Sequence, residues 1–166
     1  MTDFLTSVGF NDWILHVLLG LPVVAAIAVA LMGPEAAKRT TLLVTVVEFV
    51  LSVGLWFSVN TATGTMELVQ TVPWIPQWGI AYAVGIDGIS LMMVLLTTML
   101  MPLCVLGSFN YIKQREPAYY SLLLLLTTGM IGVFVSIDMF LFYVFWELML
   151  IPMYFLIGIW GGKNRL

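Results

Sequence analysis

The sequence predicts an all-α polytopic membrane protein with about five transmembrane helices, and three observations lead to this fold class. Of the 166 residues, 61% are hydrophobic and only 9% are charged, whereas a soluble domain is about 25% charged. The mean hydropathy is +1.06. Apolar runs of about 20 residues, the length that crosses a bilayer, recur along the chain. This composition excludes a cytosolic enzyme and a disordered segment, and a net charge of −3 without a basic patch excludes a nucleic-acid binder.

The predicted membrane spans are the five longest apolar runs, at about residues 14–32, 41–59, 89–109, 118–136 and 139–160. The first twelve residues contain two acids and no Lys or Arg, so they lack the basic region of a signal peptide, and the first run is expected to stay in the mature protein. Asp87 and Asp138 stand directly before the third and fifth runs. A short carboxylate at such a position caps the free amide groups of a helix start, and we expect this role for both.

The polar segment 60–88 is the only long connection between the runs. Its second half alternates Ile80, Tyr82, Val84 and Ile86 with small residues. This period of two predicts a short extended or hairpin element. An ordinary loop anchored by the aromatic side chains of the stretch 73–78 is an equally good interpretation.

Lys and Arg collect on the cytoplasmic side of membrane proteins, and their distribution predicts the orientation of this chain. They lie in the first and third breaks between the runs and after the last run: Lys38, Arg39, Lys113, Arg115, Lys163 and Arg165. We therefore expect the N-terminus outside, the C-terminus in the cytoplasm, and the loop 60–88 on the extracytoplasmic side.

Two acidic residues, Glu48 and Glu147, fall well inside apolar runs. An ionised side chain near the bilayer centre costs about 2.5–3.5 kcal/mol, so a carboxyl group there is a functional candidate. Glu147 lies about 12 Å from the start of its run at 1.5 Å per residue, and Pro152 leaves the carbonyl of Leu148 without a helical donor. A carboxyl group beside such a turn can bind water and a proton. Glu147 is therefore the candidate proton-relay residue, with a neutral packing glutamate as the alternative.

The sequence predicts no metal or cofactor site in this chain. Its single cysteine, Cys104, excludes a disulfide framework, a Cys-ligated zinc site and a Cys-ligated iron–sulfur cluster. No Lys or Arg lies inside an apolar run. A relay that works by switching an ion pair must therefore take its lysine from elsewhere.

The segment 137–157, which includes Phe145-Trp146-Glu147 and Pro152-Met153-Tyr154, resembles one family closely. It is similar to the fifth transmembrane helix of chain M of bacterial NADH:quinone oxidoreductase, or respiratory complex I, whose mitochondrial counterpart is subunit 4. The segments 73–76 and 86–92 resemble the outer loop and the third helix of the same family. The resemblance is weaker over the first seventy residues.

The resemblance implies a proton-translocating membrane subunit that couples to electron transfer in its neighbours. Glu147 corresponds to the essential glutamate of the family's fifth helix, which pairs with a lysine on a broken seventh helix. NADH, FMN, iron–sulfur clusters and quinone are expected on partner subunits and none in this chain. The expected partners are the other membrane and peripheral subunits and the lipid bilayer, and the expected location is the bacterial inner membrane.

Family members are longer and contain two inverted repeats, whereas this sequence stops just after the fifth helix. We therefore expect the N-terminal part of such a subunit, truncated before the first repeat is complete. The alternatives are a subunit of a multi-chain Na+/H+ antiporter and a purely structural membrane component. The coupled ion, the quinone type, the role of Glu48 and the lysine partner of Glu147 stay open.

Overall fold

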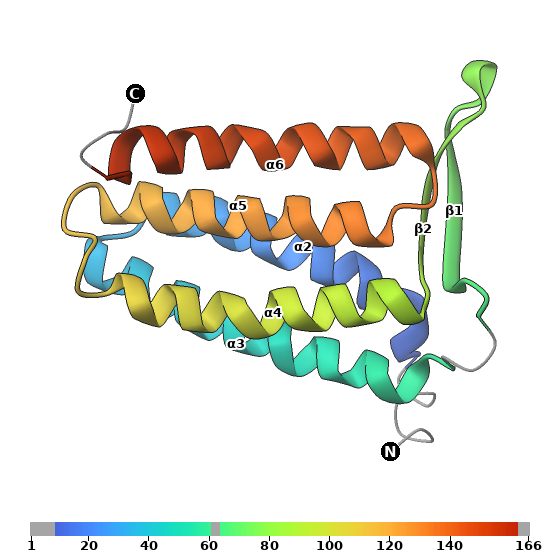
Figure 1. The fold of residues 1–166 in the computed structure, drawn as a ribbon, viewed down its shortest axis with the longest axis horizontal. Helices are drawn as coiled ribbons and strands as arrows, with labels where there is room; N and C mark the ends of the chain where they lie inside the picture. The colour runs from blue at the N-terminus through green and yellow to red at the C-terminus, as the bar shows by residue number, and fades with distance from the viewer. Residues whose placement is uncertain (1–8, 61–63, 163–166) are drawn as a thin grey trace.

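Five long helices run back and forth along one axis in the computed structural model, which describes residues 9–60 and 64–162. They are α2 (Phe10–Ala30), α3 (Pro34–Ser58), α4 (Gly88–Ser108), α5 (Glu116–Val135) and α6 (Met139–Trp160) (Figure 1). Each is long and apolar enough to cross a membrane. The predicted fold class, a polytopic helical membrane protein with about five spans, is confirmed.

The first two helices start earlier than the apolar runs suggest, at Phe10 and Pro34 in place of residues 14 and 41. Hydropathy identifies only the part of a helix that lies among lipid tails, whereas the backbone hydrogen bonds of the helix continue beyond that part. The sequence around Pro34 favours this early start, because proline is well suited to a first helical turn and Glu35 meets the positive end of the helix dipole.

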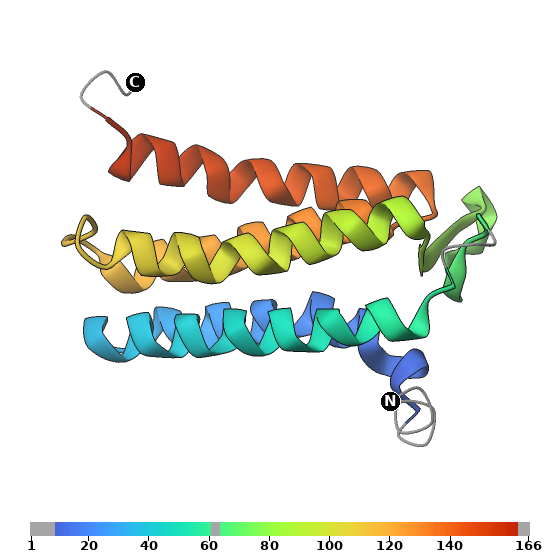
Figure 2. The ribbon, with the colours of Figure 1, turned by 60° about the horizontal axis from the view of Figure 1, so that its bottom comes forward.

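The helices form three layers, with α2 and α3 in one, α4 and α5 in the middle, and α6 alone on the far side (Figure 2). Helix α5 is central, since it packs against each of the other four. Helix α6 packs against α5 and the end of the β-hairpin. One face of α6 is therefore open.

An antiparallel hairpin lies across one end of the bundle, which we call the hairpin end (Figure 1). It consists of β1 (Glu67–Ile75), the short helix η1 (Pro76–Trp78) and β2 (Ile80–Ile86). Of the two interpretations of this segment, the hairpin is the one observed. The amide of Ile137 donates to the carbonyl of Ala83 at 2.9 Å, so β2 is attached to the connection between α5 and α6.

The opposite end, which we call the basic end, holds all the Lys and Arg side chains that the structure describes: Lys38, Arg39, Lys113 and Arg115. Lys38 and Glu116 form an ion pair of 2.7 Å between α3 and α5. The two remaining basic residues, Lys163 and Arg165, lie outside the described part of the chain.

Both predicted caps are present. The Asp87 carboxylate accepts the amide of Ser90 at 2.7 Å, and the Ser90 hydroxyl accepts the amide of Asp87 at 2.8 Å. The Asp138 carboxylate accepts the amides of Phe140 and Leu141, at 2.8 and 3.0 Å. These bonds satisfy amides that the first turn of a helix leaves without partners.

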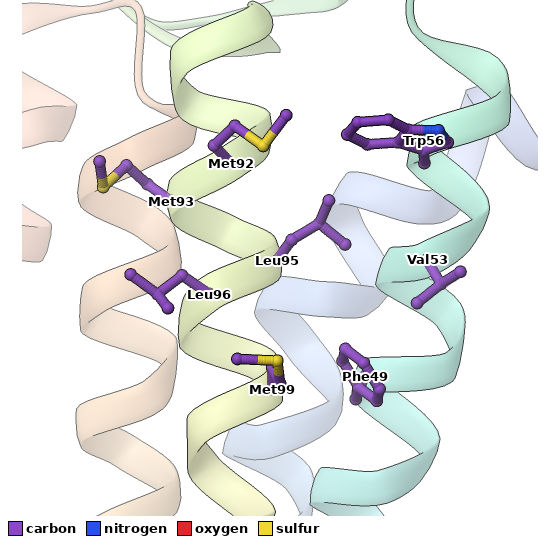
Figure 3. Close-up of a pocket in the computed structure, with 8 residues that line it drawn as sticks. All are labelled: Phe49, Val53, Trp56, Met92, Met93, Leu95, Leu96 and Met99. Atoms are coloured by element: carbon purple, nitrogen blue, oxygen red, sulfur yellow. The ribbon is translucent and has the colours of Figure 1, made fainter.

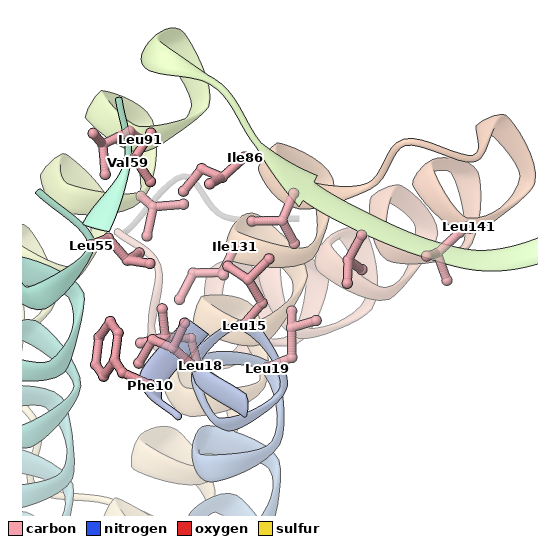
Figure 4. Close-up of a cluster of buried hydrophobic side chains, with 14 residues drawn as sticks. Phe10, Leu15, Leu18, Leu19, Leu55, Val59, Ile86, Leu91, Ile131 and Leu141 are labelled. Carbon is pink, nitrogen blue, oxygen red and sulfur yellow. The ribbon is translucent and has the colours of Figure 1, made fainter. Parts of the chain in front are cut away.

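The buried apolar side chains form two clusters, one at each end of the bundle. The cluster at the hairpin end includes Leu18, Leu55 and Ile131 and extends to β2 through Ile86 (Figure 4). The cluster at the basic end includes Val44 and Leu124. Between these clusters, the middle of the bundle carries polar side chains, and Glu48 is one of them.

Candidate functional site

Glu147 lies on the open face of α6, away from α5. The side of α6 that packs inward carries Leu141, Phe145, Met149 and Pro152. Successive helical residues are about 100° apart. Glu147 is two positions from both Phe145 and Met149, so its side chain leaves the helix on the opposite side, where it is exposed.

Two glycines on α5 allow α6 to approach closely and so set which face of α6 is turned outward. A Cβ atom on Gly129 would lie 2.9 Å from the Cβ of Met149, and one on Gly132 would collide with the ring of Phe145. Small residues at one face of a helix permit this kind of close packing in membranes. The glycine pair therefore positions the helix that carries Glu147.

The surroundings of Glu147 are aromatic and exposed. Tyr143 lies one turn before it and interacts with its carboxylate. Trp146 and Tyr154 lie on the same side and are 43% and 63% exposed. An ionised carboxylate that faced lipid tails at this depth would be unfavourable. The arrangement therefore requires protein or water over this face whenever Glu147 carries its charge.

No cation lies at the level of Glu147 in the described part of the chain, because the basic side chains there are all at the basic end. Arg39 pairs with Glu35 at 3.2 Å and Lys38 with Glu116. The described residues also contain no group of three His, Cys, Asp or Glu side chains that could hold a metal ion.

Pro152 lies within α6, and the helix continues through it to Trp160. The missing amide leaves the carbonyl of Leu148 without its helical donor, one residue from Glu147. The far end of α6 is held in place by its last residue, since the indole of Trp160 donates to the carbonyl of Gln114 at 2.8 Å. The relay candidate thus has a free backbone acceptor beside it on an otherwise anchored helix.

The structure separates the two intramembrane glutamates that the sequence presents as similar. Glu48 is 0% exposed and lies inside the bundle, whereas Glu147 is on its surface. The sequence contained a signal for this difference that hydropathy overlooks. Thr41, Thr45, Glu48 and Ser52 follow a helical spacing and form one buried polar stripe on α3.

A groove of about 560 Å³ opens between α3 and α4, and its lining is apolar (Figure 3). Phe49, Val53 and Trp56 line it from α3, and methionines and leucines line it from α4. None of the residues that line the groove has a titratable side chain. The groove therefore carries none of the chemistry that a proton site needs.

Comparison with known proteins gives consistent matches. Residues 15–135 match the family model described as NADH-ubiquinone oxidoreductase chain 4, amino terminus. The chain is 41% identical over 160 residues to NADH-quinone oxidoreductase subunit M of Rhodobacter capsulatus, a match that covers 92% of this chain and 31% of that protein. It is 39% identical over 153 residues to NAD(P)H-quinone oxidoreductase chain 4 of Gloeobacter violaceus, covering 92% and 29%. It is 37% identical over 110 residues to F(420)H(2) dehydrogenase subunit M of Methanosarcina mazei, covering 66% and 22%.

Solved structures share the arrangement of helices. A chain of respiratory complex I from Thermus thermophilus with bound NADH superposes with a TM-score of 0.76 at 27% identity, covering 91% of this chain and 30% of that one. A chain of the Mrp complex from Dietzia sp. DQ12-45-1b gives a TM-score of 0.72 at 20% identity, covering 93% and 16%, which shows a common fold. The chain thus spans about a third or less of the length of these relatives.

Proposed function

Since the chain belongs to the family of NADH-ubiquinone oxidoreductase chain 4, we propose that it forms the amino-terminal portion of a proton-translocating membrane subunit of a quinone oxidoreductase. The observation that carries the proposal is the placement of Glu147. A carboxyl group lies in the middle of a membrane helix, on its open face, beside a carbonyl that Pro152 frees. Such a residue is costly in a membrane unless it has a function.

The proposed role of Glu147 is to bind and release a proton as a neighbouring cation changes position. A cation close to the carboxylate favours its ionised form, and removal of the cation in a poorly solvated site favours the protonated form. No basic side chain of the described residues reaches this level. We propose that a lysine on another helix of the full-length subunit supplies the cation and covers the open face of α6.

Electron transfer is assigned to partner subunits in this proposal, with NADH, FMN, iron–sulfur clusters and quinone bound there. The names of the relatives support this division. They include NADH-, NAD(P)H- and F(420)H(2)-dependent enzymes, although their identity to this chain varies only between 37% and 41%. The sequence of this region stays similar among relatives that use different electron donors. Such a region is suited to a step that all these enzymes share, and we propose that this step is proton translocation. The proposed partners are therefore the other membrane and peripheral subunits, in the inner membrane of a bacterium.

The two alternatives are weaker. The match to a chain of the Mrp complex is at 20% identity and extends to the fold alone, whereas the family model and the curated relatives favour the oxidoreductase. A purely structural role for Glu147 makes a different experimental prediction, because a packing glutamate tolerates replacement by glutamine.

The test is Glu147→Gln in the full-length subunit assembled in its complex. Proton translocation is measured with a pH-sensitive dye in sealed vesicles, and the rate of quinone reduction is measured in the same vesicles. We expect proton translocation to fall at least tenfold while the complex still assembles. Glu147→Asp should retain part of the activity, since the carboxylate remains but is one methylene shorter.

Glu67→Gln is the matched control, because it makes the same substitution in the hairpin, outside the membrane helices, where Glu67 accepts the amide of Asn60 at 2.8 Å. It should translocate protons like the wild type. Wild-type translocation by Glu147→Gln in an assembled complex would remove Glu147 from the mechanism and favour the structural role.

A further inference from the structure

Glu48 is the second carboxyl group at membrane depth, and the proposed function does not use it. It lies fourteen residues after Pro34 and ten before Ser58 on α3, about 21 and 15 Å from the two helix ends at 1.5 Å per residue. Its side chain is 0% exposed. Neither of its carboxyl oxygens has a hydrogen-bond partner among the described protein atoms.

The titratable side chains on the helices that pack against α3 lie away from Glu48. Helix α2 carries Asp12 and His16, which are exposed near the hairpin end, and the described part of α4 carries Cys104, which is also exposed. On α5 and on α3 itself, the remaining groups are at the basic end: Glu116, Tyr119, Tyr120, Glu35, Lys38 and Arg39. The Glu48 carboxyl therefore has no counter-ion at its depth in the described part of the chain.

Polar groups from two further helices, α4 and α5, share the level of Glu48, between the two apolar clusters. Ser52, on the next turn of α3, forms a hydrogen bond of 2.7 Å with Thr98 of α4. On α5, Thr127 and Thr128 are buried between Leu124 of one cluster and Ile131 of the other. The middle of the bundle is thus a polar layer enclosed by apolar ends.

Two buried prolines leave backbone carbonyls without their helical donors, one in this layer and one in the adjoining hairpin-end cluster. Pro22 lies inside α2 and Pro102 inside α4. Each removes the amide that would bond to the carbonyl four residues earlier, namely that of Leu18 and that of Thr98. Thr98 is the residue that pairs with Ser52, so one freed carbonyl belongs to the residue next to the Glu48 turn.

An unpaired carboxylate in such an interior is far more costly than a neutral carboxyl, so the group takes up a proton. A protonated carboxyl has one donor and needs an acceptor, and its second oxygen needs a donor. Water supplies both, and polar buried cavities commonly hold it. We propose that Glu48 is a second protonatable site, which holds an exchangeable proton and ordered water in the polar layer of α2–α5, separate from Glu147.

This site is independent of the proposed function, because the burial of Glu48 favours a bound proton whether or not Glu147 takes part in translocation. The two glutamates lie on different helices, and α6 packs against α5 and β2, on the far side of the middle layer from α3 (Figure 2). Their tests can therefore give opposite results.

The test is infrared spectroscopy of the assembled complex at neutral pH, with the full-length subunit and its Glu48→Gln variant, in H2O and in D2O. We expect the difference between the two proteins to contain the C=O stretching band of one protonated carboxyl. The band should shift to lower frequency in D2O, because the proton exchanges through the bound water. Glu48→Asp, which keeps the carboxyl in the event that glutamine impairs assembly, should retain the band at a changed frequency.

Glu35→Gln is the matched control, since Glu35 is on the same helix but is exposed and paired with Arg39. Its substitution should leave the protonated-carboxyl region unchanged. The absence of a band in the Glu48 difference spectrum would mean that the group is ionised, and a band that does not shift in D2O would mean a sealed packing residue; either result overturns the proposal. Glu147→Gln should keep the Glu48 band even if translocation is lost.

Discussion

At the scale of single residues, four acidic side chains divide into two that cap the start of a helix and two that lie within a helix. Asp87 and Asp138 precede helices and accept backbone amides of the first turn. Glu48 is buried without a partner among the described protein atoms, and Glu147 lies on an open face. The first pair therefore stabilises the fold, whereas the second pair carries the two proposals for proton binding.

Asp87→Ala should lower the free energy of unfolding in detergent by about 1 kcal/mol, because an N-cap and half of a capping box are lost. The amide and hydroxyl of Ser90 hold the pKa of Asp87 below its ordinary value. The stabilisation is therefore complete above the unfolded pKa of about 3.9 and is lost as pH falls through the lower folded pKa. Thermal unfolding at neutral and acidic pH should show the gap between wild type and Asp87→Ala narrowing in acid, and a gap independent of pH would contradict this account.

At the scale of elements, the contact between α5 and α6 determines where the relay candidate points. Gly129 packs against the backbone of Met149, and Gly132 packs against the ring of Phe145. Both contacts are so close that a Cβ atom on the glycine would not fit. The rotation of α6 about its axis is therefore set by Phe145 and Met149, and Glu147 is turned outward as a consequence. A larger residue at either glycine should therefore shift α6 and change the direction in which Glu147 points, although neither glycine contacts Glu147.

Gly132→Ala should destabilise the protein by about 1–3 kcal/mol, the usual cost of overpacking, since the added methyl group meets the ring of Phe145. Gly158→Ala is the matched control on α6. It has open space around its Cβ position, and alanine is the better helix former there. The melting temperatures of the detergent-solubilised complexes should fall for the first variant and stay level or rise for the second.

The double variant Gly132→Ala with Phe145→Leu should recover part of the stability, because leucine removes the ring atoms that collide. Equal melting temperatures for Gly132→Ala and Gly158→Ala would show that the close approach of α6 to α5 does not matter for stability.

At the scale of the whole molecule, the described basic side chains and the β-hairpin lie at opposite ends of the helix axis. The described Lys and Arg side chains lie at the basic end and the aromatic hairpin at the other. The predicted orientation depends on this separation, because Lys and Arg collect on the cytoplasmic side and the basic end is therefore expected to face the cytoplasm. The fold itself is consistent with either direction of insertion.

The orientation can be measured with single reporter cysteines after Cys104→Ser, since Cys104 is the only cysteine in the sequence. Trp78→Cys places the reporter on the hairpin, where the side chain is 76% exposed, and Tyr111→Cys places it at the basic end, where it is 86% exposed. A membrane-impermeant maleimide should label Trp78→Cys in intact cells, and Tyr111→Cys only after permeabilisation. The reverse pattern would invert the predicted topology.

The helices themselves could be predicted from the sequence, because membrane spans depend on local properties. About 20 apolar residues, a capping Asp before the third and fifth helices and the period of two in residues 80–86 all act within a few turns of chain. The same locality explains why α2 and α3 start before the predicted spans, since each helix extends beyond its apolar run. Glu147 could likewise be selected as a candidate from its depth and from Pro152 alone.

The spacing of the polar residues on α3 gave a signal for the burial of Glu48, but only the tertiary structure decided which face of α3 and of α6 a neighbour covers. Glu147 and Glu48 are both acids in apolar runs, but the face that each presents depends on how α6 meets Gly129 and Gly132 and how α3 meets Thr98. These contacts join residues far apart in the chain. Composition and hydropathy sum over all sides of a helix, whereas burial depends on the one side that a neighbour covers. The sequence therefore determined which residues enter the membrane, and packing determined that Glu48 is enclosed and Glu147 is open.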